Sequence, residues 1–184
     1  MQHPFLVGKK LYLRGIEQKD LEGRYFDWLN DYEITKYMES SFFPNTVEKL
    51  QEYFNSIGKS NNNVLLGIID AETDTHIGNV RLGPINWVHR TSFLGIMIGE
   101  KDFWGKGYAT EALKLVVDYA FNRLNLHKVS AGANASNKAS IRAYEKIGFK
   151  IEGRRKEELY VDGTYHDGII MGLTKGDFSG RSPV

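Results

Sequence analysis

The sequence Trp104-Gly105-Lys106-Gly107-Tyr108-Ala109-Thr110-Glu111-Ala112 joins an apolar run at residues 93–98 to a stretch with strong helical periodicity. It therefore predicts the end of a strand, a glycine turn and the start of a helix. Two glycines one residue apart let the backbone turn sharply and direct successive N–H groups toward a ligand. The N-terminal end of the following helix adds partial positive charge. The turn has two interpretations, a phosphate-binding loop or a tight connection without a ligand.

Residues 109–124 carry apolar side chains at helical spacing, in steps of three and one. This pattern predicts a helix with one buried stripe. The strand expected next, at 128–133, completes a strand, helix and strand unit whose two strands run parallel through a right-handed crossover. A second helix is expected at 138–147, and Gly148 suits its C-terminal cap.

The rest of the chain alternates strand patterns with helical ones. Further strands are expected at residues 10–14, 64–69, 76–82, 149–160 and 165–173. Helical spacing occurs within residues 17–30, 31–38 and 46–57. Gly95, inside the central apolar run, marks a bulge or a close backbone approach. These elements predict a single α/β or α+β domain over residues 1–175, followed by a poorly ordered tail at 176–184.

The composition is that of an ordinary globular chain, with 184 residues of which 41% are apolar and 26% are charged. No apolar run reaches the length of a membrane span, and residues 1–5 lack the pattern of a signal peptide. The absence of cysteine excludes disulfides, thiolate nucleophiles and zinc–thiolate sites. A cytoplasmic location without membrane contact is therefore expected.

The charge balance does not favour nucleic acid as a partner. The chain carries 24 Lys and Arg residues against 23 Asp and Glu residues, a net charge of +1. The basic cluster at 154–156 is followed by Glu157 and Glu158, which favours a solvated surface over a phosphate or RNA patch. The 5 histidines show no close metal-ligand spacing, so no metal is expected.

Three segments, in order, carry a resemblance to a known family. They are Ile96-Met97-Ile98, then residues 102–112 with the glycine turn, then residues 134–149 with the sequence NASNKASIRAYEKIGF. Together they resemble the GCN5-related N-acetyltransferases (GNAT). The most similar branch is the RimJ/RimL-type, which includes ribosomal-protein N-terminal acetyltransferases and spermidine N-acetyltransferases. The resemblance covers most of the chain, from Leu11 to Leu173.

The resemblance implies a GNAT fold, with a mixed, mostly antiparallel sheet of about seven strands flanked by helices. The two central parallel strands are expected to splay apart. It also implies acetyl-CoA as cosubstrate, with its pyrophosphate on the backbone N–H groups of the turn and its pantetheine arm in the splay beside the strand ending at Ile98. The residues implied in acetyl-CoA binding are Met97, Ile98, Trp104, Gly105, Lys106, Gly107, Tyr108, Ala109, Thr110, Asn137 and Ser140.

Two positions depart from the family pattern. Asp102 stands at the first position of the Gln/Arg-x-x-Gly-x-Gly/Ala motif, so the main-chain contacts are expected without the usual side chain. Phe93 stands in the strand where relatives often carry a carboxylate that serves the substrate amine. No residue is therefore an obvious candidate for the general base.

Acetylation of an amine sets the chemistry of the site. An alkyl ammonium has a pKa of about 10, so a base or a water chain must take its proton before the nitrogen attacks the thioester. A backbone N–H of the splayed strand can hold the oxyanion, and a hydroxyl can protonate the departing thiolate. Tyr144 is the candidate acid, because it projects from the same side of its helix as Asn137 and Ser140. In the family, that side faces the cofactor sulfur.

Structural alternatives exist for each of these residues. Tyr144 can be a core tyrosine with a satisfied hydroxyl, and Asn137 can cap its helix. Glu100 is ranked first as the base, although a surface charge is the alternative for it and for every other candidate. The other candidates are Asp102, His89, Glu33 and Asp167.

The chain is thus predicted to be an N-acetyltransferase that transfers the acetyl group of acetyl-CoA to a primary amine of a protein N-terminus or a small molecule. Acidic residues in the early helices would attract a polyamine or a basic N-terminus, namely Asp27, Asp31, Glu33 and Glu39. An aminosugar or an antibiotic amine is an alternative acceptor. A homodimer or a higher homo-oligomer is among the expected states.

Two other classes of protein are less favoured. A nucleotide-binding enzyme would need the third glycine of a dinucleotide fingerprint or the Gly-Lys-Ser/Thr of a P-loop, and the turn has neither. A non-catalytic acyl-CoA-binding module would keep the turn but lose the acid. The presence of Tyr144 argues against such a module.

Overall fold

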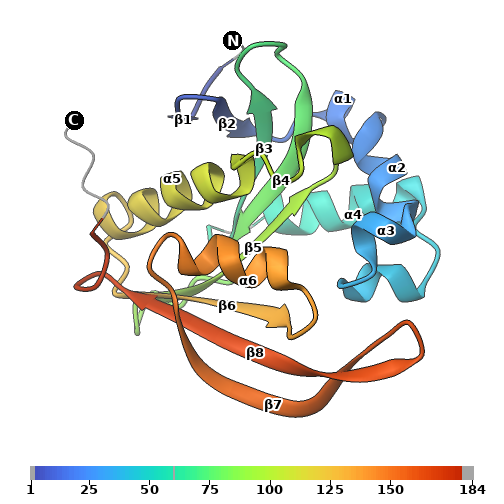
Figure 1. The fold of residues 1–184 in the computed structure, drawn as a ribbon. Coiled ribbons are helices and arrows are strands. Elements are labelled where there is room, and N and C mark those ends of the chain that lie inside the picture. Colours follow the sequence, from blue (N-terminus) through green and yellow to red (C-terminus); the bar gives the residue numbers. More distant parts are fainter. Residues whose placement is uncertain (1–2, 60, 180–184) are drawn as a thin grey trace.

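The computed structural model describes residues 3–59 and 61–179 (Figure 1). Within these residues, eight strands form one sheet in the order β1-β2-β3-β4-β5-β6-β8-β7. The strands are β1 (Leu6–Val7), β2 (Leu11–Gly15), β3 (Val64–Asp70), β4 (His76–Leu82), β5 (Thr91–Ile98), β6 (Lys128–Asn134), β7 (Lys150–Val161) and β8 (Thr164–Thr174). The sheet is antiparallel except between β5 and β6. This architecture confirms the predicted fold class, and β1 is too short for periodicity to reveal it.

The helices flank the sheet on both faces (Figure 1). They are α1 (Gln18–Leu21), α2 (Arg24–Asn30), α3 (Tyr32–Thr35), η1 (Glu39–Phe42), α4 (Val47–Gly58), η2 (Lys101–Phe103), α5 (Tyr108–Asn122) and α6 (Lys138–Glu145). The predicted strand, helix and strand unit is β5, α5 and β6, with its two strands parallel as expected.

Two hydrophobic clusters divide the core between the faces of the sheet. On one face, α5 and α6 bury residues such as Phe121 against the strands, and Ile96 packs on this cluster. On the other face, α1, α2 and α4 bury Trp28 and Leu50, and Met97 packs against them. Adjacent residues of β5 thus serve opposite layers, because successive side chains of a strand alternate between faces.

The helix expected within residues 17–30 is divided into α1 and α2. Gly23 stands between the two segments, where glycine disfavours a continuous helix. Asp20 closes a capping box with Glu17 at the start of α1. The carboxylate of Asp20 also accepts two hydrogen bonds, at 2.7 and 2.8 Å, from the buried guanidinium of Arg14. This buried pair fixes α1 to β2, so the chain must change direction before α2 begins.

The long hairpin of β7 and β8 forms a further wall of the molecule, and its tip reaches α3 (Figure 1). The hydroxyl of Tyr32 donates to a carboxylate oxygen of Asp162 at 2.7 Å. Beyond β8, Phe178 packs on Phe121 with ring centroids 5.6 Å apart, and residues 180–184 of the predicted tail lie outside the described residues. None of the helices in the described part of the chain is long and apolar enough to cross a membrane.

Candidate active site

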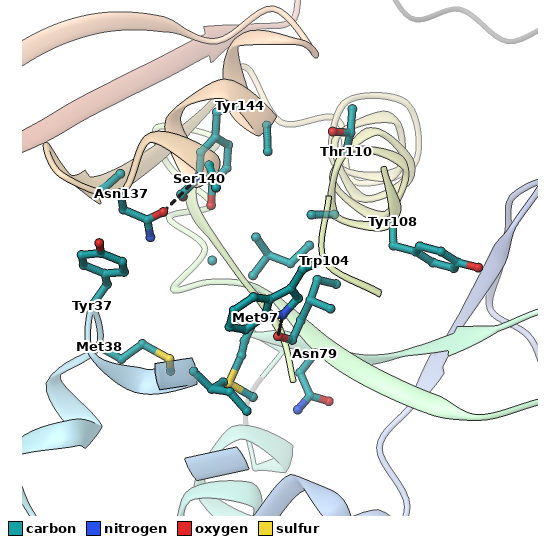
Figure 2. A pocket seen from close by; sticks show the side chains of 18 of the residues that line it. Tyr37, Met38, Asn79, Met97, Trp104, Tyr108, Thr110, Asn137, Ser140 and Tyr144 are labelled. Atoms are coloured by element: carbon teal, nitrogen blue, oxygen red, sulfur yellow. Dashed lines mark hydrogen bonds between the residues drawn. The ribbon is translucent and has the colours of Figure 1, made fainter. Parts of the chain in front are cut away.

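A cavity of about 900 Å³ passes between the two helical layers, close to the middle of the sheet. Such a volume is within the range of small-molecule sites. Its walls come from α2 to α4, the strands β3 to β6, the glycine turn, the start of α5, and α6. Figure 2 shows Tyr144, Ser140 and Asn137 of α6 on one side of the cavity and Tyr37 and Met38 on the opposite side.

The glycine turn has the backbone geometry that its sequence predicts. Gly105 has φ +72° and Gly107 has φ +89°, conformations that residues with side chains rarely adopt. A Cβ added to either glycine would meet no atom within 4 Å, so the concave face of the turn is open. Gly107 is the N-cap of α5, and the first N–H groups of a helix have no partner within the helix. The turn therefore presents free N–H groups and positive helix-dipole charge to the cavity.

The turn is anchored to the start of the chain. The ammonium of Lys10 donates to the carbonyl of Lys106 at 3.0 Å, and the carboxylate of Glu111 accepts from the backbone N–H of Lys10 at 3.0 Å. Lys106 itself is not among the described residues that line the cavity. Its position in the turn is set by this carbonyl contact rather than by its ammonium group.

Two aromatic residues of the predicted site hold the turn by hydrogen bonds. The indole N–H of Trp104 donates to the carbonyl of Ile98 at 2.8 Å, which ties the turn to the end of β5 (Figure 2). Tyr108 points away from the cavity and donates to Asp70 at 2.7 Å. This hydrogen bond raises the pKa of Tyr108 to about 12. Burial alone would raise the pKa of Asp70, but hydrogen bonds from Tyr108 and Thr73 lower it, so the carboxylate stays ionised.

The splay between the central parallel strands is present. β5 and β6 pair only from Thr91 with Lys128 to Phe93 with Ser130. Beyond that point β5 pairs only with β4, and β6 pairs with β8. The two strands therefore separate beside the glycine turn.

The direction of the backbone of β5 shows which groups face the gap. The carbonyl of Phe93 accepts from Gly83 next to β4, at 2.8 Å. Consecutive residues of a strand direct their backbone groups to opposite neighbours, so Leu94, Ile96 and Ile98 direct theirs into the gap. Beyond the last paired residue these groups have no partner on β6. Met97, by contrast, turns its backbone to β4 and offers only its side chain to the cavity.

Tyr144 lies at the point where the strands separate. Its side chain is 2% exposed, and its hydroxyl donates to the carbonyl of Leu94 at 3.0 Å. Burial raises the pKa of the Tyr144 phenol above its ordinary value, so the phenol keeps its proton. The hydroxyl thus satisfies a carbonyl of the gap and is a neutral donor beside the space between the strands.

The N-terminal end of α6 adds polar groups to the same wall. Asn137 caps α6, and its side-chain oxygen accepts from the N–H of Ser140 at 3.1 Å (Figure 2). Both residues line the cavity. Asn134, at the end of β6, is 3% exposed, and its side-chain N–H group has no hydrogen-bond partner within the described part of the chain. A buried donor without a partner at a cavity wall is suited to an acceptor on a ligand.

Two glycines make room in the strands themselves. A Cβ at Gly95 of β5 or at Gly132 of β6 would meet no atom within 4 Å, and both residues line the cavity. Open space beside Gly95 agrees with the close approach predicted from its place in the strand. Together with the turn and Asn134, this space lies next to hydrogen-bond donors that a ligand with acceptor oxygens can use.

The placement of Glu100 does not favour the predicted role of general base. Its carboxylate accepts from the indole N–H of Trp28 at 2.9 Å and pairs with Arg24. Glu100 is buried among these partners and is not one of the described residues that line the cavity. In this position it fixes α2 to the end of β5.

The other base candidates are also held elsewhere. Asp167 pairs with Arg154 and accepts from the N–H of Glu157. Asp102 and His89 are exposed and are absent from the described cavity lining. Only Glu33 lines the cavity, and it pairs with Lys101 at 2.5 Å.

Two of the four acidic residues expected in the early helices, Asp31 and Glu33, share one lysine. Lys101 also binds Asp31 at 2.8 Å, and this hydrogen bond lowers the pKa of Asp31. Within the described lining, Glu33 is the one carboxylate, whereas Asp27 and Glu39 lie outside it. Lys101 therefore offsets one negative charge of this wall.

Twelve residues of the predicted site line the cavity. They are Met97, Ile98, Trp104, Gly105, Gly107, Tyr108, Ala109, Thr110, Asn137, Ser140 and Tyr144 of the original assignment, together with Glu33 from the base candidates. Other lining residues were not predicted from the sequence, among them Tyr25, Asn79, Arg81, Ile96 and Asn134. The signal for Asn79 and Arg81 was their alternation with Val80 and Leu82 in a central strand, which places polar groups on one buried face. No group of metal-ligating side chains occurs in the described ranges.

The fold and the gap beside the glycine turn define the class of this protein. The family model of the Acetyltransferase (GNAT) domain matches residues 10–150. The chain therefore belongs to the GNAT acetyltransferase family and is an acetyl-CoA-dependent N-acyltransferase that acts on an amine. This result confirms the family and the class of reaction predicted from the sequence.

Individual relatives match nearly the whole chain. The probable N-acetyltransferase YjcK of Bacillus subtilis is 31% identical over 179 residues, covering 94% of this chain and 98% of the relative. The spermidine N(1)-acetyltransferase of Vibrio cholerae is 30% identical over 178 residues, covering 96% and 99%. A crystal structure of spermidine N-acetyltransferase from Vibrio cholerae in complex with CoA and spermine superimposes with a TM-score of 0.84 at 29% identity, covering 92% of this chain and 98% of that one.

Proposed function

We propose that the chain binds acetyl-CoA in the gap between β5 and β6 and transfers its acetyl group directly to a primary amine that enters from the α2 to α4 side. The observation that carries this proposal is the separation of β5 and β6 after Phe93 and Ser130, directly beside the open glycine turn. The gap connects the two halves of one cavity. A thioester placed there is accessible to an amine from the opposite face of the sheet.

The cosubstrate is proposed to bind mainly to backbone groups. The N–H groups at the start of α5, from Tyr108 to Thr110, suit the pyrophosphate. The exposed edge of β5 and the unpaired amide of Asn134 suit the amide groups of the pantetheine arm. Asn137 and Ser140 of α6 form the facing wall. Asp102 is not needed for this binding, because the contacts are made by the main chain.

Tyr144 is proposed to be the general acid. Acetyl-CoA supplies the thioester, and attack by the amine expels a thiolate that must be protonated or stabilised. The neutral phenol of Tyr144 lies at the gap, where its hydroxyl donates to the carbonyl of Leu94. In the proposed step, the hydroxyl turns from this carbonyl to the thiolate. The inward N–H of Ile96 is the proposed donor to the oxyanion.

The amine proton is proposed to leave through water in the cavity. Glu33 is the one carboxylate of the described lining, and it is paired with Lys101. Glu100 faces Trp28 and Arg24 instead. The protein therefore supplies space for water rather than a dedicated base.

The relatives favour a small amine as acceptor. The Vibrio cholerae relative is a spermidine N(1)-acetyltransferase, and a solved structure of such an enzyme holds CoA and spermine. A polyamine, a protein N-terminus, an aminosugar and an antibiotic amine are all primary amines that the gap can serve. The part of the cavity lined by α2 to α4 and β4, the acceptor half, determines which of them binds.

Release of free CoA from acetyl-CoA in the presence of an amine panel tests the proposal. The panel contains spermidine, a peptide with a free N-terminus, an aminosugar and an aminoglycoside. Amine-dependent release of CoA is the expected result. Binding of acetyl-CoA, measured by thermal stabilisation, without release by any amine would instead indicate a non-catalytic acyl-CoA-binding module.

A further inference from the structure

We infer that the acceptor of this enzyme is a primary amine that carries a carboxylate near the amine, and that Arg81 binds this carboxylate. The inference rests on the proposed function, because it concerns the acceptor half of the same cavity. An α-amino acid and the acidic first residue of a peptide share this chemistry.

Arg81 carries a positive charge that no carboxylate of the described residues pairs with. It is half-buried on β4 and lines the cavity. Its Nε and Nη2 atoms donate to the side-chain oxygen of Asn63 at 3.2 and 2.7 Å, and Asn63 is neutral. Among the described residues, Arg81 has no ion pair, and its remaining terminal nitrogen has no hydrogen-bond partner. A partly desolvated guanidinium is expected to have an anionic partner, so the missing partner is expected on a ligand.

The register of the sheet places Arg81 directly beside the reaction gap. Arg81 pairs with Gly95 of β5. Gly95 follows Leu94, at the point where β5 and β6 separate. Paired residues of antiparallel strands direct their side chains to the same face. A Cβ on Gly95 would meet no atom within 4 Å, so the space on this face next to Arg81 is open. An acceptor in this space has its amine at the gap and its other groups within reach of Arg81.

Neighbouring groups on this face are also hydrogen-bond donors. Asn79, two residues before Arg81 on the same strand, is 5% exposed, and its side-chain N–H group has no partner within the described ranges. Figure 2 shows Asn79 next to Met97, on the wall of the cavity. Tyr25 lines the same space, its hydroxyl has no partner among the described residues, and burial raises the pKa of its phenol, which keeps it a neutral donor. Donors without acceptors favour a ligand that brings acceptor oxygens.

The charges of the acceptor half oppose a second cationic group on the substrate. Lys36 lies over the ring of Tyr37 with its ammonium 5.5 Å from the ring centroid, and both residues line the cavity. The guanidinium of Arg81 lies over the ring of Tyr53, at 5.9 Å. The lining carboxylate, Glu33, is paired with Lys101. A polyamine would therefore meet two cations and one carboxylate that already binds Lys101, whereas the carboxylate of an amino acid would meet complementary charge.

Matched acceptors test this inference. L-Norvaline and L-norvaline amide have the same shape and differ in the carboxylate, so the ratio of their kcat/KM values, each calculated on the concentration of neutral amine, measures its contribution. The wild-type enzyme is expected to prefer norvaline by about tenfold to hundredfold, the range of a charge-assisted hydrogen bond. The dipeptides Asp-Ala and Asn-Ala form the second pair, and a larger ratio for them than for norvaline identifies a peptide N-terminus as the source. Spermidine is the cationic comparison.

Substitution of Arg81 completes the test. Arg81→Gln is expected to abolish the preference for the carboxylate while thermal stabilisation by acetyl-CoA persists, and Arg81→Lys is expected to retain part of it. The matched control is Arg155→Gln on the exposed part of β7, where the side chain pairs with Glu158 and lies outside the cavity lining. The control is expected to keep the wild-type ratio.

The outcomes separate this inference from the proposed function. Equal rates with norvaline and its amide, faster acetylation of spermidine, or an unchanged ratio in Arg81→Gln would each overturn the role of Arg81 while leaving the acetyltransferase intact. Failure of every amine to release CoA from a protein that binds acetyl-CoA would overturn the proposed function itself. Should Arg81→Gln fail to fold, the ratio in Arg81→Lys decides, and a ratio equal to that of the wild type would contradict recognition of the carboxylate by the guanidinium.

Discussion

The substitution Tyr144→Phe separates two roles of one hydroxyl. In the folded protein this hydroxyl donates to the carbonyl of Leu94 at 3.0 Å, and the residue is 2% exposed. Phenylalanine keeps the ring and leaves that carbonyl without its donor, which costs about 1–3 kcal/mol. In a domain of this size, each kcal/mol lowers Tm by roughly 2–4 °C. The structural role alone therefore predicts a decrease in Tm of about 2–12 °C.

The catalytic role of Tyr144 predicts a separate effect on turnover. Loss of a general acid typically lowers kcat by about 10²- to 10⁴-fold. The KM for acetyl-CoA is expected to change little, because the binding groups are elsewhere. Since burial raises the pKa of Tyr144, the phenol keeps its proton across the neutral and moderately alkaline range. The kcat of the wild type is therefore expected not to fall through ionisation of Tyr144 below about pH 10.

A steady-state assay of CoA release and a thermal melt measure the two effects independently. Tyr119→Phe is the matched control, because the hydroxyl of Tyr119 on α5 has no hydrogen-bond partner among the described residues and its ring packs against Phe5 at 5.1 Å. The control is expected to keep the wild-type kcat and to change stability by about 0.5 kcal/mol at most. A Tyr144→Phe enzyme with lowered Tm and wild-type kcat would refute the role as acid and leave only the structural contact.

Three further substitutions test residues that shape or surround the site. Asp20→Asn leaves the buried Arg14 without its charge partner, so a loss of about 3–5 kcal/mol is expected by chemical denaturation, and an unchanged midpoint would contradict it. Gly107→Ala places a side chain at φ +89° and is expected to lower stability by about 1–2 kcal/mol and to weaken acetyl-CoA binding, whereas Gly58→Ala, where a Cβ has open space, is the neutral control. Glu100→Gln keeps an acceptor for Trp28 and is expected to retain kcat within about threefold. A hundredfold decrease in kcat would restore Glu100 as the base.

The central part of the fold follows from local sequence signals. The glycine turn is identified by Gly105 and Gly107, and both have the positive φ that their spacing predicts. The stripe of apolar residues in α5 is buried as its period indicates. The gap between β5 and β6 was implied by resemblance alone, since no periodicity states where two paired strands separate. The pairing shows that they separate after Phe93.

The environment of the predicted charged residues depends on contacts between distant parts of the chain. Glu100 was a candidate base because of its position after β5, but Trp28, 72 residues earlier, takes its carboxylate. Asp31 and Glu33 were expected to attract a cation, and Lys101, from another element, pairs with both of them. Local sequence patterns predict which face of a helix or strand a residue occupies and whether that face is buried or exposed. They do not give the partner that determines whether a charge is available.

Strand β5 separates the proposed cofactor site from the proposed acceptor site. Its even-numbered residues, such as Ile96, direct their backbone groups into the gap, so the proposed binding of acetyl-CoA depends on strand geometry and tolerates many side chains. Its odd-numbered residues Gly95 and Met97 pair with Arg81 and Asn79 of β4, whose side chains lie on the acceptor face. Acceptor choice therefore depends on side chains from neighbouring strands and helices. A change of charge at one β4 position can alter the acceptor without disturbing the gap, and for this reason the substrate of a relative does not fix the substrate here.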